Sequence, residues 1–443
     1  MSLHKLLATV IGAGLLFGCG SGGSSSSPTV DKVVDLTNDA NTTVVSGGDA
    51  PSADAVTFFQ FKKEFDYTRL FIDIHDQVIF PDLEQFADSA ASLAAAVPAA
   101  CDTLTAVNLS NEIGPWQARW REAMSLWQRA ELYWVGPLTE NDNALRNRIY
   151  SFETTAWADP CAIDIAVVAA EDVGFDITRR ANTARGLDAL EYLLFNENLT
   201  TACSAAVPQT QGWNDLSADE RVQKRCEYAA LVANDIRTNA QTIVNEFAIN
   251  EGNYRSRFIN SGNWPDNLKQ LSDALFYIEK ETKDAKLGTP LARNDNCAGR
   301  ACPNAVESRF AAQNAAHIAD NLRAFKQLFN GGSGVGFDDL IAFEGFPEVA
   351  IEINQKVDAA LALAEQLVVS DLKMQAQIQL NDVSENLKNA CEAASLDPDN
   401  TAAANQDFCH LHGLIKNVSD QMRMDFVTIV NVDLPERAQS DND

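Results

Sequence analysis

The chain has 443 residues, of which 46% are hydrophobic, so it is long enough to bury one or two cores. Its 62 acidic residues outnumber its 34 basic residues and give a formal net charge of −28. A nucleic-acid-binding protein needs a basic face to neutralise phosphates, and no dense run of Lys and Arg occurs here, so this composition excludes nucleic acid as a partner.

The N-terminal segment 1–18 has the pattern of a lipoprotein signal peptide. Its apolar stretch 6–17 is too short to span a bilayer. Gly18-Cys19 resembles the lipobox at which bacterial lipoproteins are lipidated, and no Asp follows Cys19 to indicate inner-membrane retention. We therefore expect a lipid anchor at Cys19 in the outer membrane, facing the periplasm or the cell surface. The alternative is an ordinary cleaved signal peptide that leaves Cys19 as a free thiol.

Segment 19–55 is rich in Gly and Ser and then in Asp, Asn and Thr, with few large apolar residues. Such a composition cannot bury enough surface to order itself. As a flexible chain it would reach roughly 35 Å. We predict a tether between the lipid anchor and the folded region.

The first folded part, 56–205, is predicted to be a helical bundle. Its apolar residues recur at helical spacing, and Trp120 and Trp127 belong to a wide apolar stripe that ends at Gly136-Pro137. These tryptophans are interpreted as packing residues. The predicted helices span 68–97 with an interruption at Pro81, 116–135, 142–154, 161–174 and 176–196.

The second part, 206–435, is predicted to be another helical bundle, followed by a disordered tail at 436–443. The predicted helices span 219–248, 265–286, 304–330, 336–343, 346–369, 371–394 and 404–430. Segment 186–190 is echoed at 336–340, about 50 residues after a helix end in each half. The expected fold is therefore all-α, with two packed four-helix-like bundles. Duplication of one bundle would explain the echoed phrases, and the alternative is that the similarity of the two phrases is chance.

Eight cysteines remain after Cys19, an even number that favours disulfides in an exported protein. A structural zinc site is the alternative, but it is disfavoured because no Cys-x-x-Cys pair occurs. Proximity in the sequence suggests the pairs Cys203–Cys226, Cys297–Cys302 and Cys391–Cys409, which leaves Cys101–Cys161.

Two carboxylates three residues apart, Asp188 and Glu191, lie on one flank of the predicted helix that begins near Gly186. Like charges at this spacing repel each other mildly, so a neighbouring cation, such as an Arg or a metal ion, would stabilise the two carboxylates. The alternative is a solvated helix edge. Spacing alone does not decide between them.

The histidines give weaker candidates for metal binding. His75 on the first helix could reach across a bundle as a ligand, although a partly buried, hydrogen-bonded His fits as well, and the same holds for His317. His410 and His412 would face apart on a helix. The sequence has no His-Glu-x-x-His, phosphate-binding glycine loop or Gly-x-Ser-x-Gly motif.

Four stretches, taken in order, resemble the imelysin family of bacterial envelope proteins. The stretches are Trp120 and Trp127 leading into Gly136-Pro137, the phrase 186–194, the phrase 286–291, and Glu307-Ser308 followed by Asn321-Leu322. The family motif Gly-x-His-x-x-Glu occurs here as Gly186-x-Asp188-x-x-Glu191. The resemblance covers roughly residues 60–430.

The resemblance implies a fold of two helical bundles, an envelope location and a link to iron uptake; some members have been classed as metallopeptidases. Asp188 replaces the motif His, which leaves only oxygen donors and suits hard cations such as ferric iron or calcium. We therefore expect binding of iron or an iron complex without catalysis, with envelope iron-uptake proteins as partners. The alternatives are a scaffold that docks a membrane partner, with Asp188 and Glu191 paired to Arg146 or Arg148, and a metallopeptidase.

Overall fold

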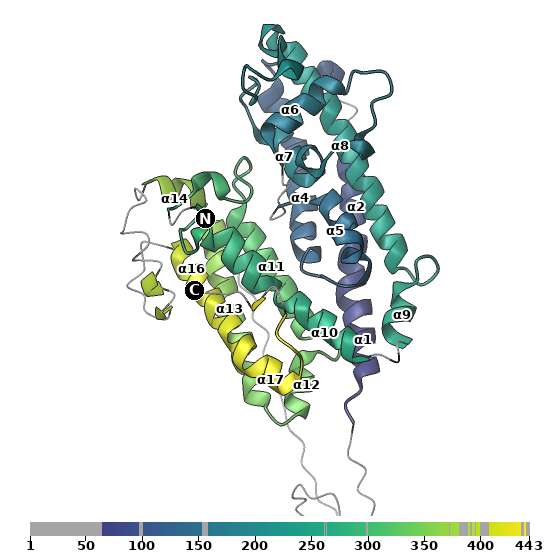
Figure 1. The fold of residues 1–443 in the computed structure, drawn as a ribbon, viewed down its shortest axis with the longest axis vertical. Helices are drawn as coiled ribbons and strands as arrows, with labels where there is room; N and C mark the ends of the chain where they lie inside the picture. Colours follow the sequence, from purple (N-terminus) through teal and green to yellow (C-terminus); the bar gives the residue numbers. More distant parts are fainter. Residues whose placement is uncertain are drawn as a thin grey trace, which may run out of the picture. The chain divides into compact units, whose positions relative to one another are not determined.

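The computed structural model describes residues 64–96, 101–152, 158–260, 262, 264–297, 300–371, 373–380, 389, 392–394, 396–398, 407–435 and 438–439. Every regular element within these ranges is a helix, which confirms the all-α class (Figure 1). The signal peptide, the tether and most of the tail fall outside these ranges, so their assignments stay predictions. No helix in the described ranges is long and apolar enough to cross a membrane.

The first helical run shows how one proline shapes the chain. Helix α1 (Tyr67–Ile74) passes through a single π-helical turn, η1 (His75–Ile79), into α2 (Phe80–Ala96). Pro81, the predicted interruption, has no N–H to donate and its ring would crowd the carbonyl four residues earlier. The wider π turn just before it accommodates the ring, so the helix continues instead of breaking.

Four helices of the first half pack on one another. Helix α8 contacts α2 and α7, and α4 contacts α2 and α7 in turn; Figure 1 shows α8 running beside α2. The predicted boundary at residue 205 therefore separates α8 from the helices on which it packs. The bounds in this half are α3 (Leu109–Glu112), α4 (Gly114–Ala130), α5 (Glu140–Ile149), α6 (Pro160–Ala169), α7 (Gly186–Phe195), α8 (Ala218–Phe247) and α9 (Tyr254–Asn260).

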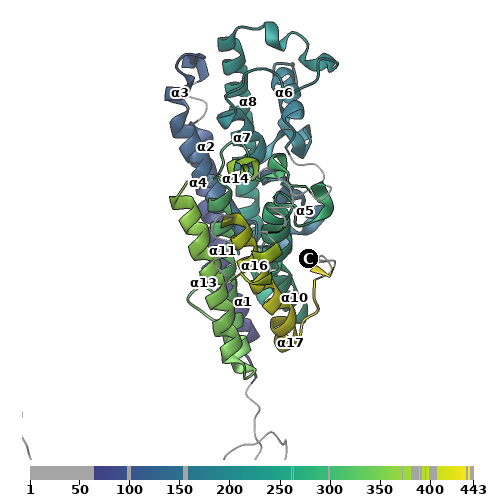
Figure 2. The same ribbon diagram turned by 90° about the vertical axis from the view of Figure 1, so that its left-hand side faces the viewer.

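A second set of helices follows. The π-helical segment η8 (Ile278–Gly288) contacts α11 and α16. Helix α13 contacts the same two helices, and Figure 2 shows α13 beside α11 and α16. Helix α11 also contacts α4, which links the two sets. The remaining bounds are α10 (Trp264–Leu275), α11 (Asn314–Phe329), α12 (Phe337–Phe343), α13 (Pro347–Val369), α14 (Met374–Leu380), α16 (Asp407–Gln421), η12 (Met422–Phe426) and α17 (Val427–Val430).

Two helices begin much later in the structure than the sequence predicts. The helix predicted at 176–196 begins only at Gly186, whose φ of +87° is outside the helical region, and short 3-10 turns precede it. The helix predicted at 304–330 begins only at Asn314, because Ser308 and Ala312 both adopt positive φ. The two segments that were predicted as helix but precede the observed starts of α7 and α11 adjoin the candidate site described below.

The disulfides confirm one predicted pair and correct two. Cys297–Cys302 forms as expected, but Cys101 pairs with Cys226 and Cys161 pairs with Cys203. Proximity in the sequence is a poor guide here because α8 lies beside residue 101 although 125 positions separate Cys101 from Cys226. Cys409 is disulfide-bonded, while Cys391 lies outside the described residues.

Candidate functional site

Helix α7 is buried along nine of its ten residues, so Asp188 and Glu191 do not form a solvated edge. The exposed fractions of these two residues are 8% and 5%. Gly186 starts the helix where a Cβ would come within 2.8 Å of the Ile149 carbonyl oxygen. The glycine of the motif therefore lets α7 approach the end of α5 closely.

The Asp188 carboxylate accepts three hydrogen bonds. The Ser151 hydroxyl donates to Oδ2 over 2.6 Å, the Ala158 N–H donates to the same atom over 3.2 Å, and the Ala189 N–H donates to Oδ1 over 3.1 Å. Burial raises the pKa of Asp188 to about 6, although these hydrogen bonds lower it in part. The carboxyl is therefore able to change charge near neutral pH.

The Glu191 carboxylate is held by a segment more than 100 residues away. Its Oε1 accepts from the Ser308 hydroxyl at 3.2 Å, the Phe310 N–H at 2.9 Å and the Ala311 N–H at 2.8 Å. Burial raises the pKa of Glu191, and the backbone donors and His317 oppose the rise. Its Oε2 has no hydrogen-bond donor among the described residues, so it is the oxygen available to a ligand.

Asp188 and Glu191 both line a small cavity of about 30 Å³, which we call the α7 cavity. A cavity needs at least about 10–15 Å³ to hold one water molecule, so the α7 cavity has room for about two waters or one partly hydrated cation. The other lining residues are Tyr150, Phe152, Ala158, Pro160, Ile163, Tyr192, Val306, Ser308, Arg309 and Phe310.

A buried polar cluster adjoins the α7 cavity, and we call it the Lys286 network. Lys286 Nζ donates to Gln128 Oε1 and Glu131 Oε1, each over 2.5 Å, and to Asn321 Oδ1 over 2.8 Å. It also lies 3.2 Å from Glu307 Oε1. All five side chains are fully buried, with at most 1% exposure. The network joins α4, η8 and α11 to the segment that precedes α11.

Tyr150 connects the two features. Its ring lines the α7 cavity, and its hydroxyl donates to Glu307 Oε1 over 2.9 Å. Burial, and then the charges of the surrounding carboxylates, raise the pKa of Tyr150 well above 10. Those carboxylates are Glu307, Glu131, Glu191 and Asp188.

Negative charge therefore exceeds positive charge in this buried region. Lys286 offsets one of the four carboxylates, Arg309 also lines the α7 cavity, and His317 Nδ1 lies 3.1 Å from Glu307 Oε2. Although burial opposes ionisation of Glu307, Lys286 and His317 together lower its pKa. Buried charge without a partner is costly, so protonation of Asp188 and Glu191 or a bound cation would stabilise the region.

Other predicted candidates lie elsewhere. His75 hydrogen-bonds to Asp76 and stacks between Phe80 and Phe247, and it is not among the residues lining the α7 cavity. His410 Nε2 hydrogen-bonds to the Pro398 carbonyl oxygen.

In the alternative interpretation Asp188 and Glu191 pair with an Arg such as Arg146 or Arg148, but no such ion pair occurs among the described residues, and Arg148 is exposed. Arg146 donates to the Glu131 carbonyl oxygen and stacks on Trp134. No group of three or more His, Cys, Asp or Glu side chains in the described part of the chain is arranged to hold a metal ion.

Sequence reasoning missed several residues of the site. Ser151, which holds Asp188, and Tyr150 lie in a segment predicted to be plain helix. In the sequence Ser308 is marked only by the phrase Glu307-Ser308, and Glu131 is marked only by its place next to the tryptophan stripe. The one clue in the sequence is that the phrases 286–291, Glu307-Ser308 and Asn321-Leu322 all belong to the family resemblance, and the structure brings them together at one place.

Comparison with known proteins agrees with this arrangement. A family model described as Peptidase_M75, Imelysin, matches residues 79–396. Two solved structures have similar folds. One, provisionally described as an iron-regulated protein A precursor from Parabacteroides distasonis, has 15% identity and a TM-score of 0.53, covering 80% of this chain and 94% of that chain. The other, an imelysin-like protein from Psychrobacter arcticum, has 13% identity and a TM-score of 0.52, covering 83% and 96%.

A search of curated proteins found no match. The family match spans most of the chain and includes α7, the Lys286 network and the segment that holds Glu191. The protein belongs to the imelysin family.

Proposed function

We propose that this protein binds a hard cation, with iron as the expected one, at Asp188 and Glu191 and does not act as an enzyme. The observation that carries this proposal is the pair of buried carboxylates on the wall of one small cavity, with Glu191 Oε2 lacking a donor. The excess of buried negative charge supports it, since a cation would offset that charge. One structurally similar protein is described as iron-regulated, which supports iron as the cation.

The donor set fits a cation of this kind in part. Carboxylate and hydroxyl oxygens are the ligands that hard cations prefer. With only two carboxylates from the protein, a bound cation would keep water molecules as its other ligands. The α7 cavity has room for about one partly hydrated cation of this kind. The same volume is too small for an organic iron chelate, so the proposal is for the ion itself.

Calorimetric titration with ferric, ferrous, calcium and zinc ions tests the proposal. We expect iron binding that Glu191→Gln weakens by at least about tenfold, equivalent to about 1.4 kcal/mol. Asp338→Asn is a matched control, because Asp338 belongs to the echoed phrase on α12 and burial also raises its pKa to about 6, but it does not line the α7 cavity. Absence of binding, or equal affinity in Glu191→Gln, would overturn the assignment.

The catalytic alternative needs a separate measurement. A zinc peptidase would use two His and a Glu on one helix, a motif that the sequence lacks. Incubation with an unfolded polypeptide, with and without a chelator, should show no turnover. Cleavage that the chelator abolishes and Glu191→Gln removes would show that the protein is an enzyme.

We also propose that Cys19 carries the lipid that holds the protein in the cell envelope, near iron-uptake proteins. The support is the Gly18-Cys19 pattern after a short apolar stretch. Membrane fractionation of the full chain and of Cys19→Ser tests it. We expect the variant to move to the soluble fraction, and equal membrane attachment of both forms would contradict the proposal.

A further inference from the structure

Five aromatic side chains lie at one end of the folded unit that begins at Phe65, and we call them the aromatic patch. Helices α1, α10 and α12 reach this end in Figure 1. Tyr67 of α1 stacks on Trp264 of α10, with 4.1 Å between the ring centroids. Phe65 links this pair to α12, since its ring lies 5.2 Å from Tyr67 and 5.5 Å from Phe343. The fifth member, Phe346, lies between the end of α12 and the start of α13.

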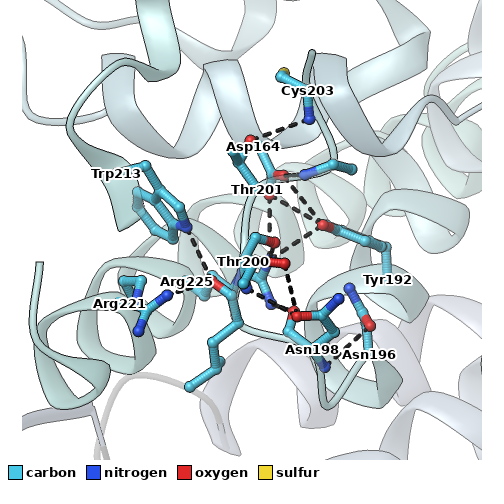
Figure 3. A network of polar contacts seen from close by, with 12 residues as sticks. Asp164, Tyr192, Asn196, Asn198, Thr200, Thr201, Cys203, Trp213, Arg221 and Arg225 are labelled. Carbon is cyan, nitrogen blue, oxygen red and sulfur yellow. Dashed lines mark hydrogen bonds and ion pairs between the residues drawn. The ribbon is translucent and has the colours of Figure 1, made fainter. Parts of the chain in front are cut away.

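The aromatic patch is open to solvent although its rings contact one another. Trp264 is 43% exposed and Phe346 is 44% exposed, and the other three members are half-buried. By contrast, Trp213 in the polar network of Figure 3 is 2% exposed, and its indole N–H donates to the Leu199 carbonyl oxygen over 2.9 Å. A contiguous group of exposed rings indicates an interaction surface, whereas single exposed apolar residues do not.

The chain enters the folded unit inside the aromatic patch. Phe65 is the first residue of this unit, and residues 20–64 separate it from Cys19. A flexible chain of that length reaches roughly 35–40 Å, and it would hold the patch at an effective concentration on the order of millimolar at the surface that carries the lipid. Even a weak contact with that surface is then populated.

The sequence directly before the patch has the composition of a membrane-interface segment. It contains Phe58, Phe59 and Phe61, followed by Lys62 and Lys63. Aromatic rings are enriched at the boundary between membrane and water. A lysine can lay its stem along apolar surface there while its charge stays in water. The aromatic character of the patch therefore continues along the chain towards Cys19.

The charges around the patch favour a neutral lipid surface over an anionic one. Glu344 and Glu348 lie on either side of Phe346 and are exposed, and the whole chain has a net charge of −28. An anionic lipid surface would repel these charges. Burial, and then the charge of Glu344, raise the pKa of Tyr67, so its hydroxyl stays neutral.

A second copy of the chain fits the patch less well. An aromatic side chain has an area of about 150–250 Å², and no member of the patch is more than 44% exposed. Five such side chains offer well below the roughly 800 Å² per partner that a stable dimer buries. A lipid surface needs no matching partner area, because each ring can enter the headgroup region separately.

We propose that the aromatic patch docks on the headgroup region of a zwitterionic lipid surface, with Trp264 and Phe346 entering the interface. This inference rests on the proposed lipid at Cys19, which brings that surface within reach. Docking holds the folded unit in one orientation, with the ends of α1, α10 and α12 towards the lipid, so that the unit does not rotate freely about its tether.

Fluorescence quenching by brominated lipids tests the docking in the full, lipidated chain. Vesicles of phosphatidylcholine carry bromine on the acyl chain near the headgroup, and Trp264 is the one exposed tryptophan among the described residues. We expect quenching that Trp264→Phe largely removes. At low ionic strength, brominated phosphatidylglycerol should quench at least about threefold less. No quenching that depends on Trp264, or equal quenching by the anionic lipid, would overturn the proposal.

Two variants at opposite ends of α13 test the patch without changing the reporter. Phe346→Glu puts a charge into the interface and should lower the quenching at least about threefold. Val369→Glu is the matched control, because Val369 is 87% exposed at the other end of the helix, roughly 35 Å away, and its replacement should leave the quenching unchanged. Circular dichroism verifies that both variants fold. Unchanged quenching in folded Phe346→Glu would contradict the docking.

Flotation with the vesicles separates a failure of the docking from a failure of the anchor. A chain that floats because of Cys19 but shows no quenching of Trp264 would disprove the docking alone. A chain that does not float would disprove the anchor. Sedimentation of Cys19→Ser without lipid should show a monomer, and a dimer that Phe346→Glu abolishes would assign the patch to a second copy instead.

Discussion

The Ser308 hydroxyl donates a hydrogen bond to Glu191 Oε1 over 3.2 Å, although the two residues are 117 positions apart. The Phe310 and Ala311 N–H groups bind the same oxygen. Glu191 thus fixes the segment before α11 onto α7. It has a structural role through Oε1 and remains available to a ligand through Oε2.

This division of roles predicts different stabilities for two variants. Glu191→Ala leaves three buried donors without an acceptor and should lower the free energy of unfolding by about 2–4 kcal/mol. Glu191→Gln keeps an oxygen for the same donors and should lower it by about 1 kcal/mol or less. Urea unfolding measures both. An equal loss in the two variants would show that the three hydrogen bonds do not hold the segment.

Asp188 should make stability fall as pH rises. Its folded pKa of about 6 exceeds the ordinary value of 3.8, so the folded state holds the proton more tightly than the unfolded state does. The resulting stabilisation is complete below pH 3.8 and is lost as pH rises through 6, a change of about 3 kcal/mol. The difference in unfolding free energy between the wild type and Asp188→Asn should change by this amount between pH 3 and pH 8. The exposed Asp88→Asn should show no comparable change.

Lys286 should be among the most sensitive buried positions. Lys286→Met leaves Glu131 and Glu307 without the cation that pairs with them, so we expect a loss of about 3–5 kcal/mol in the free energy of unfolding. Lys269→Met removes a half-exposed lysine from a pair with Asp273 and should change stability by less than about 1 kcal/mol. Thermal and urea unfolding at neutral pH compare the two. Similar small effects would mean that the network contributes little.

The disulfides should differ in their contributions to stability. By the chain-entropy estimate, Cys101–Cys226 closes a long loop and contributes about 5 kcal/mol, whereas Cys297–Cys302 closes a short loop and contributes about 2 kcal/mol. Paired Cys→Ser substitutions at each bridge, followed by urea unfolding, measure this difference. Peptide mapping without reduction verifies the pairing independently, and a Cys101–Cys161 peptide would contradict the structure.

Much of the fold could be predicted from the sequence because long amphipathic helices have a strong periodic signal. Helix α8 and helix α13 begin within one residue of the predicted starts, and Ser217 with Glu220 forms the capping box that begins α8. The starts of α7 and α11 were missed because Gly186 and Ser308 adopt positive φ, a backbone choice set by tertiary contacts and not by apolar spacing.

The candidate site was predictable only in part. Asp188 and Glu191 could be identified from one motif, and the structure shows that they share a cavity. Their partners could not, because Ser151 and Ser308 approach from separate segments through turns. The burial of both carboxylates was also hidden, since Leu187 and Leu190 define one apolar face while the opposite face is covered by the segment before α11.

The pairing of the cysteines has a consequence for how the chain matures. Cys161–Cys203 is nested inside Cys101–Cys226. In a chain that is oxidised from its N-terminus as it enters an oxidising compartment, Cys101 meets Cys161 before Cys203 or Cys226 has emerged. The first bond formed in that order would be non-native, and it would have to be exchanged through a mixed disulfide before α8 could join α2. We therefore expect maturation to require a disulfide isomerase, and an oxidase alone to yield misbridged chains.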